Sequence, residues 1–465
     1  MSILKRGVGP DRRWFYPASG TGLRFILAYL GIWSLFYPYL QNVYGLDTVA
    51  PLAAGASAVG VGVMVIGPPI AGTILDYLET PKIPFAIAAA SFFVGMLLLA
   101  SMFAIDSWAE AQWFYYAGSF LTGIGVGMTA GTAVPTLSRW YRGERMGRAM
   151  GIINMGDPLG RVALAPIVAG LIAYIGFGYD LFLLIGIVGA VVVVIVGVVL
   201  WRNPTQEEID SGVLSASLDD EDDDGADNGE PDEAMSADAA PEGDSGAEDD
   251  GEESIDEEGV TIGEAVKMKE FWILYFAMMG AAFSYMGLLQ NISTIMIEGL
   301  TIGGYSEAYV ADWLVPTFLS LTGLLTAIGA YVWGDLMDRL GGPWRTLPFI
   351  YGIPAVLIGV FYFGYTNLYL VLGIGAVMFF FFGGEPAVHY AAVPHLFGRK
   401  NIGMVMSYIN AFSVGTGIVL GPTVMAYIND LWGGYALALA LAVALRLLST
   451  GLSLYGLRVS KAKAK

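Results

Sequence analysis

Long apolar runs separated by short polar segments dominate the chain. Twelve such runs of about 20 or more residues recur along the sequence, and this is the length that an α-helix needs to cross a bilayer. Strands of a membrane barrel are a poor alternative, because the runs are longer than such strands and do not alternate between apolar and polar residues. The predicted spans cover 22–45, 50–76, 83–105, 112–138, 147–176, 178–201, 269–297, 309–337, 345–364, 367–396, 401–428 and 434–457.

The positively charged residues test this count. If the N-terminus is placed inside and the spans alternate, the outer loops contain no Lys or Arg, and 21 of the 23 basic residues fall on the inner side. The other two, Arg161 and Arg446, lie within spans. So complete a positive-inside bias indicates twelve helices with both termini in the cytoplasm. We therefore expect an all-α integral protein of the cell membrane, surrounded by the lipid bilayer.

Composition adds one segment to this picture. The chain is 55% hydrophobic and 14% charged, whereas soluble domains carry about a quarter charged residues. The net charge of −19 has a local source, since residues 203–260 hold 24 Asp and Glu and no Lys or Arg, and the remaining chain carries +5. A segment this acidic and this poor in aromatic residues cannot bury enough apolar surface to fold. We expect a first six-helix half (1–202), a disordered cytoplasmic linker (203–264) and a second six-helix half (265–465). The linker is a solvated spacer or, alternatively, a regulatory tether or cation-binding segment.

The two halves repeat each other. With a constant offset of 256 residues, five positions of the first half carry the same residue in the second half, and a shared order of matches is the signature of a duplicated unit. The pairs are Gly147 and Gly403, Asn154 and Asn410, Pro166 and Pro422, Gly178 and Gly434, and Tyr179 and Tyr435. Duplicated six-helix halves are one way in which secondary transporters are built.

Short motifs carry a family resemblance. Residues 334–341 (GDLMDRLG) and the loop from Arg139 to Gly151 resemble the loop motifs of the major facilitator superfamily. The first-half copy of the former motif, residues 72–82, has Glu79 where glycine is usual. The resemblance implies two pseudo-symmetric six-helix bundles that rock about a central site. It also implies a cytoplasmic latch, for which a weak surface salt bridge worth under about 1 kcal/mol is the alternative. The latch residues are Asp76, Asp338, Arg339 and Arg145.

A second resemblance concerns the substrate class. Residues 395–403 (HLFGRKNIG), followed by Gly421-Pro422 and Asp430, are similar to the oxalate–formate antiporter and monocarboxylate transporter branch. That branch implies a basic residue in helix 8 and another in helix 11. The predicted spans 309–337 and 401–428 contain no Lys or Arg. A monocarboxylate or another small anion therefore fits better than oxalate.

Ionisable residues within spans are expensive and are candidates for function. Asp157 and Arg161 are four residues apart and share one face of the fifth span. They form either a neutralised structural pair or a site in which Arg161 attracts a carboxylate, through two parallel hydrogen bonds, while Asp157 takes up a proton.

A similar pair lies in the tenth span. Glu385 and His389, again four apart, are predicted to face the pathway, because helices 1, 4, 7 and 10 line the cavity in this architecture. The pair couples protons to transport, forms a structural hydrogen bond or contacts substrate. Arg446 snorkels or pairs with an unidentified acid. Neutral candidates either hold helices together or touch substrate, and they are Asn154, Asn410, Gln41, Gln290, Asn291 and Tyr37.

These features favour a secondary active transporter. Cysteine is absent and two histidines are present, so we expect no metal site, no cofactor and no enzyme activity. The basic residues lie in short loops against the membrane, which argues against a nucleic-acid partner. We expect a monomer that moves a small organic anion, a mono- or dicarboxylate, by symport or antiport with protons or a counter-anion. An exporter of drug-like or lipophilic compounds is the alternative.

Overall fold

The structure is a computed structural model that describes residues 7–9, 12–26, 28–141, 149, 152–205, 208, 260–397, 405 and 408–463. Within these residues it consists of helices and connecting segments, without a strand. The first half contains α1 (Phe15–Ile26), η2 (Ala28–Phe36), α2 (Tyr37–Tyr44), α3 (Ala50–Gly60), η3 (Val61–Ile66), α4 (Gly67–Leu78), α5 (Lys82–Ser101), η4 (Met102–Ala104), α6 (Trp108–Trp140), α8 (Gly156–Ile175), α9 (Tyr179–Val193) and η5 (Val194–Leu200). The second half contains α11 (Ile262–Ala265), α12 (Lys269–Ile302), α13 (Glu307–Tyr309), η7 (Val310–Leu314), α14 (Val315–Leu340), α15 (Pro343–Gly364), α16 (Leu368–Leu370), η8 (Val371–Gly375), α17 (Ala376–Phe397), η9 (Ile409–Val414), α19 (Gly415–Trp432) and α20 (Ala436–Lys463).

These elements join into twelve helices that are long and apolar enough to cross a membrane, which confirms the predicted number in the described residues. They run over Phe15–Tyr44, Ala50–Leu78, Lys82–Ala104, Trp108–Trp140, Ile152–Ile175, Tyr179–Leu200, Lys269–Ile302, Glu307–Met337, Pro343–Gly364, Leu368–His389, Ala411–Trp432 and Ala436–Val459. The first helix begins seven residues before the predicted boundary at 22, because Pro17, Ser19 and Thr21 keep its first turn from being recognised as part of the apolar run.

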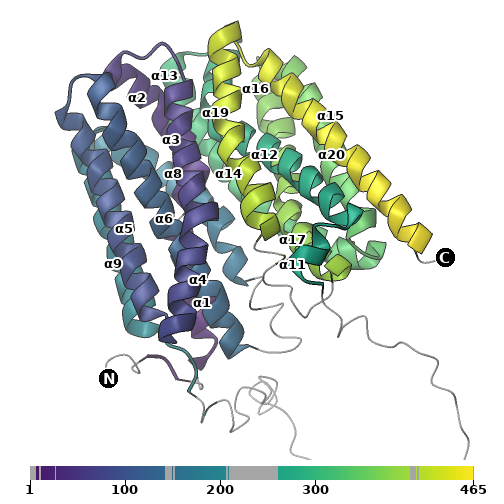
Figure 1. Cartoon of the computed structure of the whole chain (residues 1–465). Helices are drawn as coiled ribbons and strands as arrows, with labels where there is room; N and C mark the ends of the chain where they lie inside the picture. Colours follow the sequence, from purple (N-terminus) through teal and green to yellow (C-terminus); the bar gives the residue numbers. More distant parts are fainter. Residues whose placement is uncertain are drawn as a thin grey trace, which may run out of the picture.

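The helices form two bundles that lie side by side (Figure 1). α1 to α9, in purple and blue, make up the first bundle, and α12 to α20, in green and yellow, make up the second. We call the end at which α1 begins and α20 ends the termini end, and the opposite end the far end. The predicted linker lies largely outside the described residues, but its first residues contact the first half: Asn203 Nδ2 donates to Glu79 O at 2.8 Å, and Arg202 pairs with Glu208 at 2.6 Å.

Glycines bring helices within each half into close contact. A Cβ on Gly123 of α6 would lie 2.3 Å from Val59 O of α3, and one on Gly127 would lie 2.6 Å from Gly62 O of η3. A Cβ on Gly421 of α19 would similarly lie 2.3 Å from Phe283 O of α12. Lipid tails remove the hydrophobic drive between helices, so such backbone contact is a main source of their association.

Glu79 has an unusual backbone conformation for its residue type. It ends α4 with a φ of +50°, while Gly341, at the corresponding place after α14, has a φ of +79°. Left-handed conformations at helix ends favour glycine, because it has no Cβ. The departure from the glycine motif at position 79 is therefore a change of residue without a change of backbone geometry.

The largest contacts between the two halves come from three helix pairs: α3 packs against α19, α8 against α14, and η2 against α12. The polar contacts in these joints belong to the middle or the far part of the helices. They are Ser34 Oγ to Leu289 O (3.2 Å), Ser293 Oγ to Ser34 Oγ (3.1 Å), Gln290 Nε2 to Leu30 O, Ser57 Oγ to Val419 O (2.5 Å), Ser57 Oγ to Thr423 Oγ1 (2.6 Å) and Ser320 Oγ to Val162 O (2.9 Å).

Asp430 connects the two halves at the far end. Its carboxylate, near the end of α19, accepts hydrogen bonds from Val49 N (3.0 Å) and Ala50 N (2.7 Å), where α3 begins. The first backbone N–H groups of a helix lack partners within the helix and attract negative charge. A residue of the second half therefore caps a helix of the first half. Tyr39 Oη adds a bond to Asp312 Oδ1 at 2.7 Å in the same region.

Replacing Asp430 by alanine should loosen the far end. Loss of a helix cap costs about 1 kcal/mol, which is about fivefold in the population of the separated state. The chain has no cysteine, so Ala53→Cys, on fully buried Ala53 of α3, provides a single reporter thiol. We expect Asp430→Ala to raise the rate of maleimide labelling at this thiol about fivefold. The control Asp180→Ala removes an exposed carboxylate and should leave the rate unchanged; equal rates in all three proteins would contradict the role of Asp430.

Candidate functional site

Arg161 is buried at the boundary between the halves. It lies on α8 and is 1% exposed, and none of its three side-chain nitrogens has a hydrogen-bond partner among the described residues. Two glycines make room for it: a Cβ on Gly31 of η2 would lie 2.1 Å from Arg161 Cδ, and one on Gly323 of α14 would lie 3.1 Å from Arg161 Cβ. η2 and α8 belong to the first half and α14 to the second. The side chain therefore lies where the two halves meet.

Two further polar residues lie near Arg161. The Tyr285 hydroxyl, on α12, interacts electrostatically with Arg161 and Asp157, but it forms no hydrogen bond of regular geometry with the guanidinium. Asp157 is half-buried. Although it lies four residues before Arg161, the ion pairs of the described residues do not include this pair. The predicted alternative of a neutralised structural pair is therefore not formed here.

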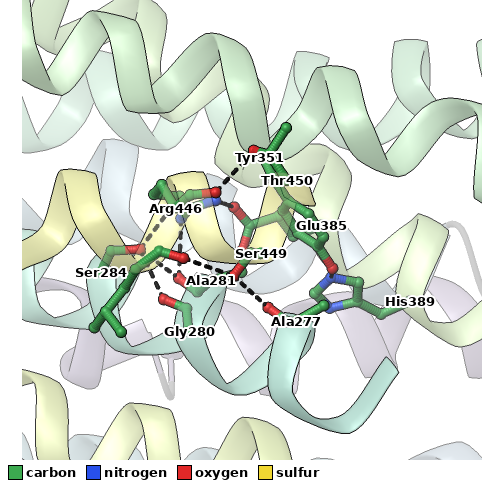
Figure 2. A network of polar contacts seen from close by, with 11 residues as sticks. Ala277, Gly280, Ala281, Ser284, Tyr351, Glu385, His389, Arg446, Ser449 and Thr450 are labelled. Carbon is green, nitrogen blue, oxygen red and sulfur yellow. Dashed lines mark hydrogen bonds and ion pairs between the residues drawn. The ribbon is translucent and has the colours of Figure 1, made fainter. Parts of the chain in front are cut away.

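Arg446 has the opposite environment. It is fully buried on α20, and its guanidinium pairs with Glu385 of α17 (Figure 2). Its Nε donates to Ser284 Oγ at 2.6 Å and its Nη2 donates to Ala281 O at 3.0 Å, both on α12. The ring of Phe382, one turn from Glu385, lies 4.5 Å from the guanidinium carbon. The acid that the sequence did not identify for Arg446 is Glu385, and the pair joins three helices of the second half.

Their place in the tenth helix predicted that Glu385 and His389 face the pathway. In the structure they do not face the boundary between the halves. Glu385 is 3% exposed and His389 is 4% exposed. His389 Nε2 forms a 2.6 Å hydrogen bond with Tyr351 Oη of α15, and Glu385 points to α20 (Figure 2). Both therefore turn toward helices of their own half. The order of the helices in the chain predicted which helices lie near Glu385 and His389. It did not predict which way the two side chains point, because this depends on their partners Arg446 and Tyr351.

The neutral candidates separate into different environments. Asn291 has all of its polar atoms engaged, because its Nδ2 donates to Gly287 O (2.8 Å) and Pro422 O (3.1 Å) and its Oδ1 accepts from Tyr435 Oη (2.9 Å). This is the pattern of a residue that holds helices together. Gln290 donates across the halves to Leu30 O, and its Oε1 is buried without a partner among the described residues.

The remaining candidates form no hydrogen bond with Arg161 or lie outside the described side chains. Tyr37 is fully buried, and its hydroxyl has no partner among the described residues. Gln41 donates to Leu46 O at 3.4 Å near the far end, and Asn154 is exposed. The side chain of Asn410 lies outside the described part.

The predicted latch residues make contacts within a half. Asp76 of α4 pairs with Arg139 of α6 at 3.1 Å, and Arg339 pairs with Asp335 of its own helix at 2.8 Å. These side chains are 33% to 78% exposed, so each pair contributes little to stability. Arg145 and the side chain of Asp338 lie outside the described part. A latch between the halves stays a prediction.

Sequence reasoning missed the glycines around Arg161. Gly31 and Gly323 lie far apart in the chain, and glycine is common in membrane helices for packing alone. The sequence signal that could have indicated them is that both glycines lie in spans that meet the other half. It also missed Ser284 and Phe382, which look like ordinary span residues until Arg446 is placed.

The Glu385–Arg446 pair gives a stability prediction. Arg446→Gln leaves a buried carboxylate unpaired, which typically costs about 3–5 kcal/mol, so the detergent-solubilised protein should melt at a clearly lower temperature. Glu385→Gln should behave similarly. The double variant Glu385→Gln/Arg446→Gln removes both charges and should recover most of the melting temperature, whereas Arg458→Gln, at an exposed position, serves as the control. A double variant less stable than either single variant would show that the pair is not mutually compensating.

Comparison with known proteins agrees with this architecture. The family model described as the Major Facilitator Superfamily matches residues 25–384 and 319–465. The oxalate:formate antiporter of Oxalobacter formigenes is 20% identical over 388 residues, which are 83% of this chain and 78% of that protein. An uncharacterized 38 kDa protein in a 23S RNA operon of Thermoproteus tenax is 27% identical over 185 residues, which are 40% of this chain and 46% of that protein. The match over most of the chain and the twelve helices have one consistent explanation: this protein is a membrane transporter, not an enzyme, and it belongs to the Major Facilitator Superfamily.

Proposed function

We propose that this transporter is a secondary carrier of small organic anions and that Arg161 binds the substrate. The observation that carries the proposal is a buried guanidinium without a hydrogen-bond partner among the described residues, at the boundary between the halves. A buried charge without compensation costs several kcal/mol. A carboxylate that accepts two parallel hydrogen bonds from the guanidinium offsets this cost and is oriented by it.

The balance of charges favours a monocarboxylate over a dicarboxylate. Of the two arginines near mid-span, Arg446 is neutralised by Glu385, which leaves one positive charge for the substrate. α14 has no basic residue before Arg339, but Arg161 of α8 packs against it at Gly323. Arg161 therefore supplies a charge beside the helix where the oxalate–formate branch is expected to hold one. The name of the oxalate:formate antiporter supports carboxylates as the substrate class.

The arrangement of the halves fits transport by alternating access. With both termini in the cytoplasm, the far end faces outward, and there Asp430 and Tyr39 connect the halves. These bonds have to break for the far end to open. Arg161 would then change its surroundings as α8 and α14 move against each other, which is the requirement for a substrate site that is exposed alternately to the two sides of the cell membrane.

Proton coupling fits Asp157 better than Glu385. Protonation of Glu385 would leave the buried charge of Arg446 uncompensated. Asp157 is half-buried, lies one turn from Arg161 and is not held in an ion pair with it. A proton on Asp157 removes a negative charge beside the site and so strengthens anion binding at Arg161. Exchange against a counter-anion would use Arg161 alone.

The test of the substrate site is uptake by reconstituted protein. We expect saturable uptake of labelled monocarboxylates, and an apparent affinity reduced about 100-fold or more by Arg161→Gln, because a charge-assisted hydrogen-bond pair is lost. Arg161→Lys should recover part of it, since the charge stays and the two parallel bonds are lost. Arg458→Gln is the matched control. Wild-type uptake by Arg161→Gln, or no uptake of any mono- or dicarboxylate by the native protein, would overturn the proposal.

The coupling prediction uses the same vesicles. Asp157→Asn should keep exchange of internal for external anion but lose accumulation driven by a pH gradient, because the amide cannot bind the proton. The readout is the ratio of uptake with an inward proton gradient to uptake without one, which should fall to about one in the variant. A variant that accumulates anion as the native protein does would remove Asp157 from coupling.

A further inference from the structure

Tyr285 lies between the two charged clusters. Its side chain is half-buried, and its hydroxyl interacts electrostatically with Arg161 and Asp157 of the first half and with Glu385 of its own half. It is carried by α12, which packs against η2 across the boundary. Of the second-half residues whose polar atoms are described, Tyr285 is therefore well placed to add a donor to an anion on Arg161.

The ring of Tyr285 contacts Phe382, which in turn contacts Arg446. Its centroid lies 5.1 Å from that of Phe382, which is fully buried. Phe382 also contacts the Arg446 guanidinium, which lies 4.5 Å from its ring. Cation–π and aromatic contacts of this kind fix the orientation of the rings. Phe379 adds a second ring at 6.0 Å from Tyr285.

The same arginine also contacts the helical turn that precedes Tyr285. Ser284, the preceding residue, accepts a 2.6 Å hydrogen bond from Arg446 Nε and is fully buried. Arg446 in turn is held by Glu385 and by Ala281 O (Figure 2). The guanidinium thus contacts both Ser284, which precedes Tyr285 in the chain, and Phe382, which packs against the ring of Tyr285.

We propose that Tyr285 is a second anion-binding residue and that the Glu385–Arg446 pair is a positioning device that holds its ring through Phe382 and Ser284. This inference rests on the proposed role of Arg161 as the anion site. A carboxylate that takes two hydrogen bonds from Arg161 keeps lone pairs that need another donor. A hydroxyl that already lies near Arg161 and is held in place by its ring contacts spares part of the ordering cost of binding. The substrate carboxylate is then held by one residue from each half, so that its binding depends on how the halves meet.

Tyr285→Phe tests the first part, because it removes the hydroxyl and keeps the ring packing. We expect KM for the monocarboxylate to rise about tenfold with little change in the maximal rate, as for one hydrogen bond to a charged group. Tyr365→Phe is the matched control, since its hydroxyl donates to Glu298 at 3.4 Å near the far end of the same half. An unchanged KM in Tyr285→Phe would overturn the proposal.

The double variant Glu385→Gln/Arg446→Gln tests the positioning. It should raise KM by a similar factor, and adding Tyr285→Phe to it should raise KM little further, because both changes remove the same interaction. If the Glu385–Arg446 pair had a purely structural role, the double variant would lower the amount of folded carrier and leave KM unchanged. If the KM effects of the double variant and of Tyr285→Phe multiplied in the triple variant, they would be independent, which would also exclude positioning. Phe382→Leu replaces the double variant if the latter does not reach the membrane.

The outcomes separate this inference from the proposed function. If Arg161→Gln abolishes uptake while Tyr285→Phe leaves KM unchanged, the anion site stands and the role of Tyr285 falls. If Arg161→Gln transports as the native protein does, both fall. A tenfold rise in KM for Tyr285→Phe alone, with no further rise when Tyr285→Phe is added to the double variant, supports both.

Discussion

A guanidinium buried among membrane-spanning helices needs partners for its charge and for its N–H groups, because the hydrocarbon region around the bundle offers none. Arg446 finds them within its own half, from Glu385, Ser284 and Ala281. Arg161 finds none among the described residues of either half. The two arginines are equally buried, so the difference between them lies in compensation. In the second half the buried arginine is neutralised by Glu385. In the first half the buried arginine has no hydrogen-bond partner among the described residues, and it lies where the two halves meet.

The packing around Arg161 places this charge at the boundary between the halves. Gly31 and Gly323 let helices of both halves approach its side chain, so it lies against surfaces of both halves. The bonds at the far end, above all those from Asp430 to the start of α3, close that end in the present arrangement. The latch pairs described at the termini end stay within their own half. If Arg161 binds the substrate, as proposed, substrate binding and the contact between the halves depend on the same residues.

Residues four apart illustrate both the reach and the failure of sequence reasoning. Glu385 and His389 share a helix face, as their spacing predicts, and both are buried, yet each has a partner on a different helix. Asp157 and Arg161 share a face too, but no ion pair forms between them in the described residues. Spacing places side chains in the same direction. Whether a charge meets a partner there depends on which helix lies opposite, and that is set by packing across the whole bundle.

The number of helices, the two similar halves and the segregation of basic residues follow from the sequence by itself, because a helix in lipid satisfies its own backbone and needs only an apolar stretch of sufficient length. The presence of buried charges at positions 161, 385 and 446 follows from it as well. Only the tertiary structure decided that Glu385 neutralises Arg446 across 61 positions of the chain and that Arg161 is left without a partner among the described residues. The energy of a buried charge depends on neighbours a few ångströms away, and the contacts that bring those neighbours together join residues distant in sequence.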